Sequence, residues 1–177
     1  MKHAIYLLIF FFSSLNAANW GDRETHHTFD GIEWYDMHYT SQKVGCTFLL
    51  PNYDKSQPYS NFLVEGYYDD YYTDIVNLLS QIDGQSYFIQ TANGSIGSID
   101  SGKEFKKLVK EFYPGISNVQ WLDAKKFGAK YALAFTYFHE GKPAYGRVFY
   151  KNKRLFNACS SDRNEVRRNY FFDHIHF

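Results

Sequence analysis

Polar and apolar residues alternate roughly over residues 28–39, and several short apolar runs follow as far as residue 160. This alternation, and short apolar runs bounded by Gly, Pro or Asn, are both typical of β-strands. One run ends at Pro51, as expected at a strand end, because proline has no amide hydrogen to donate. These patterns predict strands at residues 28–39, 45–51, 61–68, 86–92, 129–138, 144–150 and 154–160.

Residues 73–83 follow a helical period instead. Four apolar residues share one helix face, at positions i, i+3, i+4 and i+7: Ile75, Leu78, Leu79 and Ile82. Thr73 is a suitable N-cap, and Gly84 follows the last apolar position. We therefore expect a helix over residues 73–83.

Residues 101–112 carry the clearest helix signal in the chain. Ser101 and Glu104 form a capping box, in which each side chain accepts a hydrogen bond from a backbone N–H at the helix start. The apolar stripe that follows consists of Phe105, Leu108, Val109 and Phe112. Pro114-Gly115 then ends the helix.

The chain ends in a further expected helix and an extended tail. Asp162 is able to cap this helix, with Glu165 three residues later. Three side chains are expected to face inward: Val166, Tyr170 and Phe171. Residues 174–177 then form the tail.

The first 18 residues have the pattern of a secretory signal peptide. Lys2 precedes an apolar run over residues 4–12, and small residues follow up to Ala17 and Ala18. The run is much shorter than the roughly 20 apolar residues of a membrane span; a buried N-terminal strand is the alternative. We expect export to the periplasm or extracellular space, and no transmembrane segment after signal removal. A loose lead-in over residues 19–27 and one domain over residues 28–177 would follow.

The overall composition is that of a folded protein without bulk charge. Lys and Arg total 19, as do Asp and Glu, so the formal net charge is zero. This balance argues against a nucleic-acid partner held by bulk positive charge. Aromatic residues make up 20% of the chain, and their preference for half-buried pleated surfaces favours a sheet-based core.

Basic residues are numerous in the second half of the chain. Four lysines form the solvent face of the capped helix: Lys103, Lys106, Lys107 and Lys110. Further basic residues include Lys125, Lys126, Lys130, Lys151, Lys153, Arg154, Arg163, Arg167 and Arg168. With a net charge of zero they imply a basic region opposite an acidic one, which is more often a solvated surface than a binding stripe.

Both cysteines, Cys46 and Cys159, lie in expected strands. In an oxidising compartment an even pair more often bridges than stays reduced, so we expect a disulfide between Cys46 and Cys159. Two buried free thiols are the alternative. Neither cysteine has a nearby His or second Cys, so the sequence indicates no zinc site and no catalytic thiol.

Four of the seven histidines occur as two close pairs, His26-His27 in the lead-in and His174 with His176 in the tail. On an extended tail His174 and His176 point to one side. Two ligands are fewer than the three or four that a tight zinc site requires, and nothing in the sequence joins the pairs. We therefore expect solvated or hydrogen-bonded surface histidines, no bound metal and no cofactor.

The most unusual segment combines four tyrosines with three aspartates. It contains Tyr67, Tyr68, Asp69, Asp70, Tyr71, Tyr72 and Asp74. An ordinary strand edge that runs into a helix start is one interpretation, with Asp supplying caps. A surface for a basic protein partner is the second, and a Ca²⁺ site is the third, although the spacing is not that of an EF-hand loop.

The C-terminal third resembles a group of small exported bacterial proteins. The resemblance rests on the runs Gly-Arg-Val-Phe-Tyr at 146–150 and Arg-Leu-Phe-Asn-Ala at 154–158, and on Tyr-Phe-Phe-Asp-His-Ile-His-Phe at 170–177. Gly45-x-x-Phe48-x-x-Pro51 also resembles the opening strand of those proteins, whereas His174 stands where they have Ser. The resemblance implies a PsbP/Mog1-like fold used for docking and assembly, with no catalytic set to transfer.

We therefore expect an α+β fold, in which an antiparallel β-sheet is flanked by helices as an α/β/α sandwich of the PsbP/Mog1-like type. The sequence contains no nucleophile elbow, no HExxH motif and no Cys–His arrangement. The function expected is that of an exported, non-enzymatic binding or adaptor domain with a protein partner. A small secreted hydrolase with dispersed His and Asp residues is the alternative, because triads are defined in space.

The signal-peptide interpretation predicts that the mature protein begins at Ala18 or Asn19. Cleavage is expected there because small residues precede a change to polar sequence. Sequencing the N-terminus of exported material checks this, and exported protein that retains Met1 would contradict it.

Overall fold

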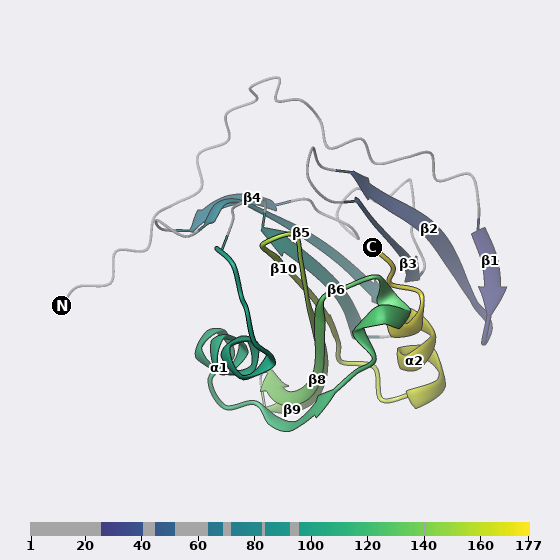
Figure 1. The fold of residues 1–177 in the computed structure, drawn as a ribbon. Helices are drawn as coiled ribbons and strands as arrows, with labels where there is room; N and C mark the ends of the chain where they lie inside the picture. The colour runs from purple at the N-terminus through teal and green to yellow at the C-terminus, as the bar shows by residue number, and fades with distance from the viewer. Residues whose placement is uncertain are drawn as a thin grey trace.

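The part of the chain that the structure describes forms two antiparallel β-sheets, two α-helices and a short 3₁₀ turn (Figure 1). This computed structural model describes residues 26–40, 45–51, 64–68, 72–82, 84–92, 96–139 and 141–177. The smaller sheet has the order β1-β2-β3, with β1 at His26–Phe29, β2 at Ile32–Thr40 and β3 at Gly45–Pro51.

The larger sheet has seven strands in the order β4-β5-β6-β10-β9-β8-β7. In chain order these are β4 (Val64–Tyr68), β5 (Tyr72–Ile82), β6 (Gln85–Ala92), β7 (Ser117–Trp121), β8 (Tyr131–His139), β9 (Lys142–Lys151) and β10 (Arg154–Ser160). The helices are α1 (Gly102–Phe112) and α2 (Glu165–Asp173), and the 3₁₀ turn η1 covers Ala124–Phe127.

Tight turns join two of the strand pairs. Asn152 and Lys153 connect β9 to β10 with φ values of 50° and 65°, and Asp30 and Gly31 connect β1 to β2 with 50° and 72°. Positive φ at both central positions is the geometry whose twist matches paired antiparallel strands. The β9–β10 turn thereby fixes the register at the centre of the larger sheet.

Helix α1 covers one face of the larger sheet. The predicted capping box is present: Ser101 Oγ accepts a hydrogen bond from the N–H of Glu104 at 3.2 Å. The Glu104 carboxylate accepts from the N–H of Asp100 at 3.1 Å, one residue before the expected position. The helix buries Phe105 and Val109 in a cluster completed by Ile99, Leu133, Phe135, Val148, Tyr150 and Leu155.

Gly146 permits the close packing of β8 on β9. Phe135 lies directly opposite Gly146, and a Cβ at this position would lie 2.5 Å from two carbons of the Phe135 ring. A glycine in a strand interior often marks such a close approach. Any larger residue here has to displace the Phe135 ring.

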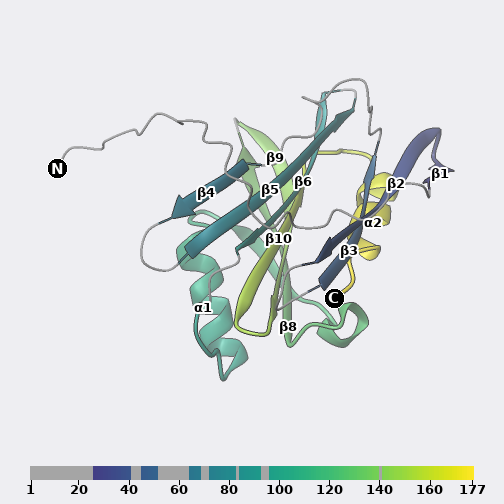
Figure 2. The ribbon, with the colours of Figure 1, turned by 90° about the horizontal axis from the view of Figure 1, so that it is seen from above.

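The opposite face of the larger sheet is covered by α2 together with the smaller sheet (Figure 2). Ring contacts join the three layers, with Tyr87 of β6 5.5 Å from Trp34 of β2 and 5.3 Å from Phe171 of α2, between ring centroids. The C-terminal tail continues the smaller sheet, because Thr47 and His176 exchange backbone hydrogen bonds of 2.8 and 2.9 Å.

The predicted α/β/α sandwich is wrong. The layer opposite α1 is a second β-sheet with α2, so two packed antiparallel sheets dominate the architecture rather than one sheet between helices. Phe48, Leu49 and Leu50 of β3 are buried in the cluster between this second sheet and the larger one. Neither helix in the described ranges is long and apolar enough to cross a membrane.

The predicted helix over residues 73–83 is also wrong, because Tyr72–Ile82 is the long strand β5. It pairs with β4 on one side and with β6 on the other. Strand β6 pairs with it from Ile75 to Ile82 and β4 pairs with its first half, from Tyr72 to Asn77. This tertiary pairing outweighs a helical apolar spacing. The terminal helix is confirmed, but its N-cap is Asn164 rather than Asp162.

Burial of Phe171 is confirmed, since its side chain is completely enclosed. We expect Phe171→Ala to lower the free energy of unfolding by roughly 3–5 kcal/mol, because the vacated space cannot fully close. Urea denaturation followed by circular dichroism measures the loss. The control is Phe138→Ala, whose side chain is 74% exposed. A loss under about 1 kcal/mol at Phe171 would mean that α2 contributes little to the core.

Candidate functional site

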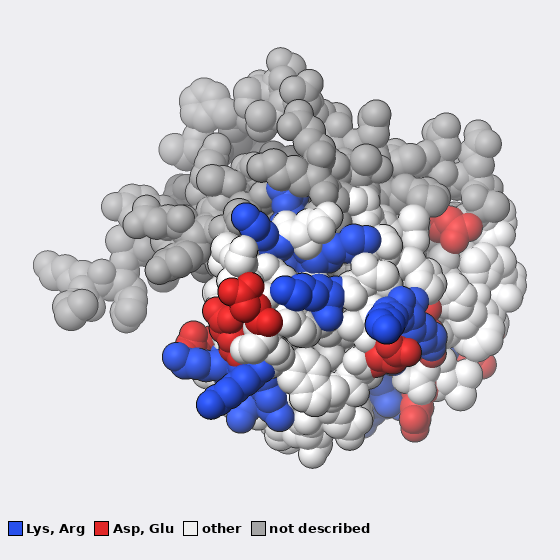
Figure 3. Space-filling view, viewed as in Figure 1, with Lys and Arg blue, Asp and Glu red and all other residues white. Residues whose placement is uncertain are grey.

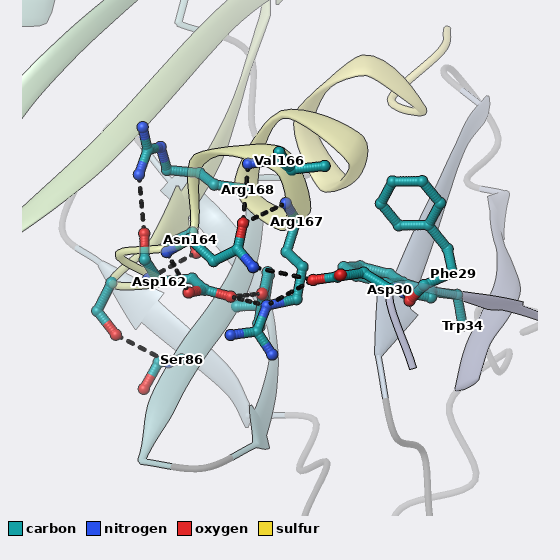
Figure 4. A network of polar contacts seen from close by, with 12 residues as sticks. Phe29, Asp30, Trp34, Ser86, Asp162, Asn164, Val166, Arg167 and Arg168 are labelled. Atoms are coloured by element: carbon teal, nitrogen blue, oxygen red, sulfur yellow. Dashed lines mark hydrogen bonds and ion pairs between the residues drawn. The ribbon is translucent and has the colours of Figure 1, made fainter. Parts of the chain in front are cut away.

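A buried carboxylate, Asp162, lies between the end of β10 and the start of α2 and is 1% exposed (Figure 4). The Tyr87 hydroxyl donates a short hydrogen bond to Asp162 Oδ2. The N–H of Asn164 donates to Oδ1 at 2.7 Å, and Arg167 Nε lies 3.2 Å from Oδ2. The carboxylate therefore joins β6 to the first turn of α2.

The same contacts extend to the β1–β2 turn. Asp30 Oδ2 accepts a hydrogen bond from Asn164 Nδ2 at 2.9 Å and lies 3.5 Å from Arg167 Nε. Beside it, Trp34 Nε1 donates to the carbonyl of Phe29 at 3.2 Å. We call Asp30, Tyr87, Asp162, Asn164 and Arg167 the Asp162 network, which ties the smaller sheet, α2 and the larger sheet together.

The electrostatics of the Asp162 network favour an anchoring role. Burial, followed by the hydrogen bond to Asp162 and its charge, raises the pKa of Tyr87 well above its usual range, so its hydroxyl stays a donor. Arg168 adds a second guanidinium, whose Nη1 donates to the Asp162 carbonyl at 2.9 Å. The buried Asp162 carboxylate is thus paired with the Arg167 guanidinium, which it shares with the more exposed Asp30.

A second anchor holds the end of α2. Arg147 of β9 donates from Nη1 to Asp173 Oδ1 at 2.8 Å, and Lys126 Nζ lies 3.7 Å from the same oxygen. The Arg147 guanidinium also lies 5.6 Å from the Phe127 ring centroid and 4.8 Å from that of Phe172, within cation–π range. Residues that carried the family resemblance, Arg147 and Asp173, therefore meet as a structural pair.

One histidine from each of the two sequence pairs lies against the same tyrosine, a proximity that the sequence did not predict. His27 of β1 and His174 both contact the ring of Tyr170, at 5.9 and 4.3 Å between centroids, so the two pairs flank one tyrosine. His174 Nδ1 also lies 2.7 Å from the Tyr170 carbonyl. Among the described residues no group of three His, Cys, Asp or Glu side chains is placed to hold a metal ion.

His26 has a carboxylate partner among the described residues, which bears on the hydrolase alternative. Its Nε2 lies 3.3 Å from Glu33 Oε2, while the Thr28 hydroxyl donates to Glu33 Oε1 at 2.9 Å. A catalytic triad places the imidazole between the hydroxyl and the acid. Here the acid is in the middle, so this histidine does not activate Thr28.

The expected disulfide is not formed, and both cysteines are buried free thiols. Cys46 belongs to the core beneath the smaller sheet, whereas Cys159 contacts Asn157 at 3.3 Å on the α1 face of β10, so the sheet separates them. Burial raises the pKa of Cys46 far above its usual range and that of Cys159 to about 11. Neither thiol is ionised near neutral pH, so neither is a ready nucleophile.

The described residues at 67, 68 and 72–74 belong to two paired strands, β4 and β5, rather than to a strand-to-helix junction. Tyr67 and Tyr68 end β4, Tyr72 and Asp74 begin β5, and Tyr68 pairs with Tyr72. Asp69, Asp70 and Tyr71 lie outside the described residues. Because β4 is the edge strand, the structure places the segment at one margin of the larger sheet.

An exposed tryptophan marks the other margin of this sheet. Trp121, the last residue of edge strand β7, is 49% exposed. Its ring lies on the start of α1, where a Cβ at Gly102 would lie 3.0 Å from the indole, and its centroid is 6.2 Å from that of Phe105. We call Trp121 and the first turn of α1, residues 102–104, the Trp121 surface.

The sequence patterns did not single out Trp121 as a surface residue, although its polar neighbours indicated exposure. It is an aromatic residue at the end of a strand whose neighbours Asn118, Gln120 and Asp123 are polar. An exposed tryptophan by itself says little about binding, because single exposed apolar residues are common. It points to an interaction site when it is part of a larger exposed surface.

Two backbone and side-chain contacts place other elements beside the segment that leads into α1. Lys130 Nζ donates to the carbonyl of Ile99 at 2.7 Å, and the N–H of Ile96 donates to the Lys153 carbonyl at 2.9 Å. These bonds bring the β9–β10 turn and the start of β8 beside that segment.

The chain matches no family of known proteins, no curated protein and no solved structure in the three comparisons made. The resemblance drawn from its C-terminal residues therefore stays a prediction.

The Arg147–Asp173 pair predicts how stability depends on pH. Burial alone would raise the pKa of Asp173, but the hydrogen bond and charge of Arg147, with Lys126, hold it below its usual range. A lowered folded-state pKa stabilises the fold above the unfolded-state value of about 3.9 and ceases to do so as the pH falls through the folded-state value. We expect Asp173→Asn to cost about 1 kcal/mol near neutral pH, since the pair is half exposed.

Urea denaturation of both proteins across the acid range measures this difference, which should shrink below about pH 4. The matched control is Glu111→Gln, which breaks the exposed pair with Lys107. A difference that grows on acidification would show that the Asp173 carboxylate does not stabilise the fold.

Proposed function

We propose that this chain is an exported binding or adaptor domain that contacts a protein partner through the Trp121 surface. The observation that carries the proposal is a half-exposed indole held in place on the first turn of α1. Aromatic rings of this kind supply large contact area at a small cost in side-chain entropy, and tryptophan is enriched among the residues that dominate binding energy.

The surroundings of the ring support this role. The Phe105 ring stacks on Tyr131, with centroids 5.5 Å apart, and the Tyr131 hydroxyl donates to the carbonyl of Asp100 at 3.0 Å. These contacts fix the floor beneath Trp121 in the free protein. A partner therefore meets an ordered surface and does not have to order it on binding.

Residues 67–74 stay a second proposed contact, for a basic protein segment. The position of Tyr67 and Tyr68 in edge strand β4 supports it, since an edge strand offers unpaired backbone groups to another chain. They lie at the opposite margin of the sheet from Trp121. An adaptor requires two separate contact regions of this kind.

Affinity capture with the purified chain as bait tests the proposal. We expect Trp121→Ser to lose proteins that the unchanged chain retains, because the ring provides the contact area. The matched control is Phe138→Ser, which removes a more exposed aromatic residue from β8 away from this surface. Equal losses from both variants would indicate general stickiness, and unchanged capture by Trp121→Ser would refute the proposal.

A further inference from the structure

Strand β7 is the last strand at one margin of the larger sheet, and part of its backbone faces outward. Trp121 lies opposite Leu133 of β8. The next residue, Leu122, donates its N–H to the carbonyl of Ala132 at 3.1 Å. In an antiparallel pair, residues bonded to the neighbouring strand alternate with residues whose N–H and C=O point away from it. The N–H and C=O of Trp121 therefore point to the open side of β7, where the described part of the chain supplies no further strand.

The beginning of β7 is fastened to β8 by its side chains. The register shifts between Ser117 and Gln120, and Asn118 has a positive φ of 49°. Ser117 Oγ lies 2.8 Å from Thr136 Oγ1, which also accepts a hydrogen bond from Asn118 Nδ2 at 3.0 Å. A bulge of this kind interrupts pairing at an edge, so the regular open stretch of β7 is residues 119–121.

This open stretch lacks the residues that commonly protect a sheet edge. Natural edge strands carry Lys, Pro or inward-pointing charges, which hinder pairing with another chain. Strand β7 contains neither proline nor any charged residue. Val119 packs against the cluster beneath α1, and the Trp121 ring lies on Gly102, so both offer apolar surface on the α1 face. An incoming strand meets hydrogen-bonding groups and an apolar wall together.

We propose that the partner at the Trp121 surface binds as an extended polypeptide segment, which adds a strand to β7. This inference rests on the proposed binding function and names the form in which the partner binds. An extended backbone presents N–H and C=O groups at the spacing of this edge, whereas the groups of a helix bond internally. The partner residue opposite Trp121 exchanges backbone bonds with it and lays its side chain beside the indole. That residue is therefore apolar or aromatic, and it is not proline.

Charge favours a different chain over a second copy of this one. Two copies joined antiparallel through β7 form one continuous sheet, with both α1 helices on the same face beside the joint. Each α1 carries four lysines and two glutamates, and charged side chains of both signs lie over it in Figure 3. Like net charges on neighbouring helices oppose that arrangement, and an extended segment brings no second helix.

A strand-forming peptide tests the proposal. The probe is a blocked heptapeptide of alternating threonine and valine with tyrosine at its centre. We expect its binding to slow hydrogen exchange at the Trp121 amide, measured by NMR, because that N–H becomes bonded. N-methylation of the valine and tyrosine nitrogens should weaken binding at least about tenfold, since it removes the donors of one peptide edge. Equal binding of both peptides, no binding, or binding without slower exchange at Trp121 would overturn the proposal.

Gln120→Lys tests the edge in the chain itself, because it places a charge on the open stretch while the Trp121 ring remains. It should weaken peptide binding by about tenfold, since lysine is a common guard of edge strands. The matched control is Asn169→Lys in α2, the same added charge at an exposed position away from β7. The control should stay within about twofold of the unchanged chain. Equal binding by the two variants would overturn the proposal.

Further measurements separate this inference from the function on which it rests. If Trp121→Ser abolishes capture of proteins but the peptide does not bind, the binding function stands and strand addition is wrong. Unchanged capture by Trp121→Ser would instead remove the binding function itself. Sedimentation of the chain alone detects a second copy as the occupant. Self-association that Gln120→Lys abolishes, without peptide binding, would replace the separate partner with another copy of this chain.

Discussion

Strand β10 lies in the middle of the larger sheet and is buried along its whole length, which requires cover on both faces. Helix α1 supplies cover on one side, and α2 with the smaller sheet supplies it on the other. Where a second sheet covers the first, polar turns and helix ends have to be held against the larger sheet. The Asp162 network and the Arg147–Asp173 pair do this with charges that are balanced where they are enclosed.

The contacts of Arg147 follow from the same need to cover the larger sheet. A planar guanidinium can pair with a carboxylate and lie on an aromatic ring at once, as Arg147 does between Phe127 and Phe172. Lysine lacks this geometry and is strongly hydrated, so it is left at the surface.

Errors in the sequence interpretation have identifiable causes. The apolar spacing of Ile75, Leu78, Leu79 and Ile82 satisfies a helix, but β4 and β6 lie on both sides of the segment and make it a strand. The Asp30-Gly31 pair is a strong hairpin signal, and it divides the single strand expected at 28–39 into β1 and β2. His26 and His27 consequently belong to β1 rather than to a loose lead-in.

Local chemistry determined what the sequence could predict by itself. The capping box of α1 and the strands β8 to β10 with their tight turn depend on residues that are near in the chain. The apolar pattern of the terminal helix was enough to predict the burial of Phe171, although not what it packs against. The layer order, the separation of Cys46 from Cys159, the histidines around Tyr170 and the exposure of Trp121 depend on residues far apart in it. Tertiary structure alone decided these, because a side chain's burial depends on which layer packs against its strand, and periodicity does not name that layer.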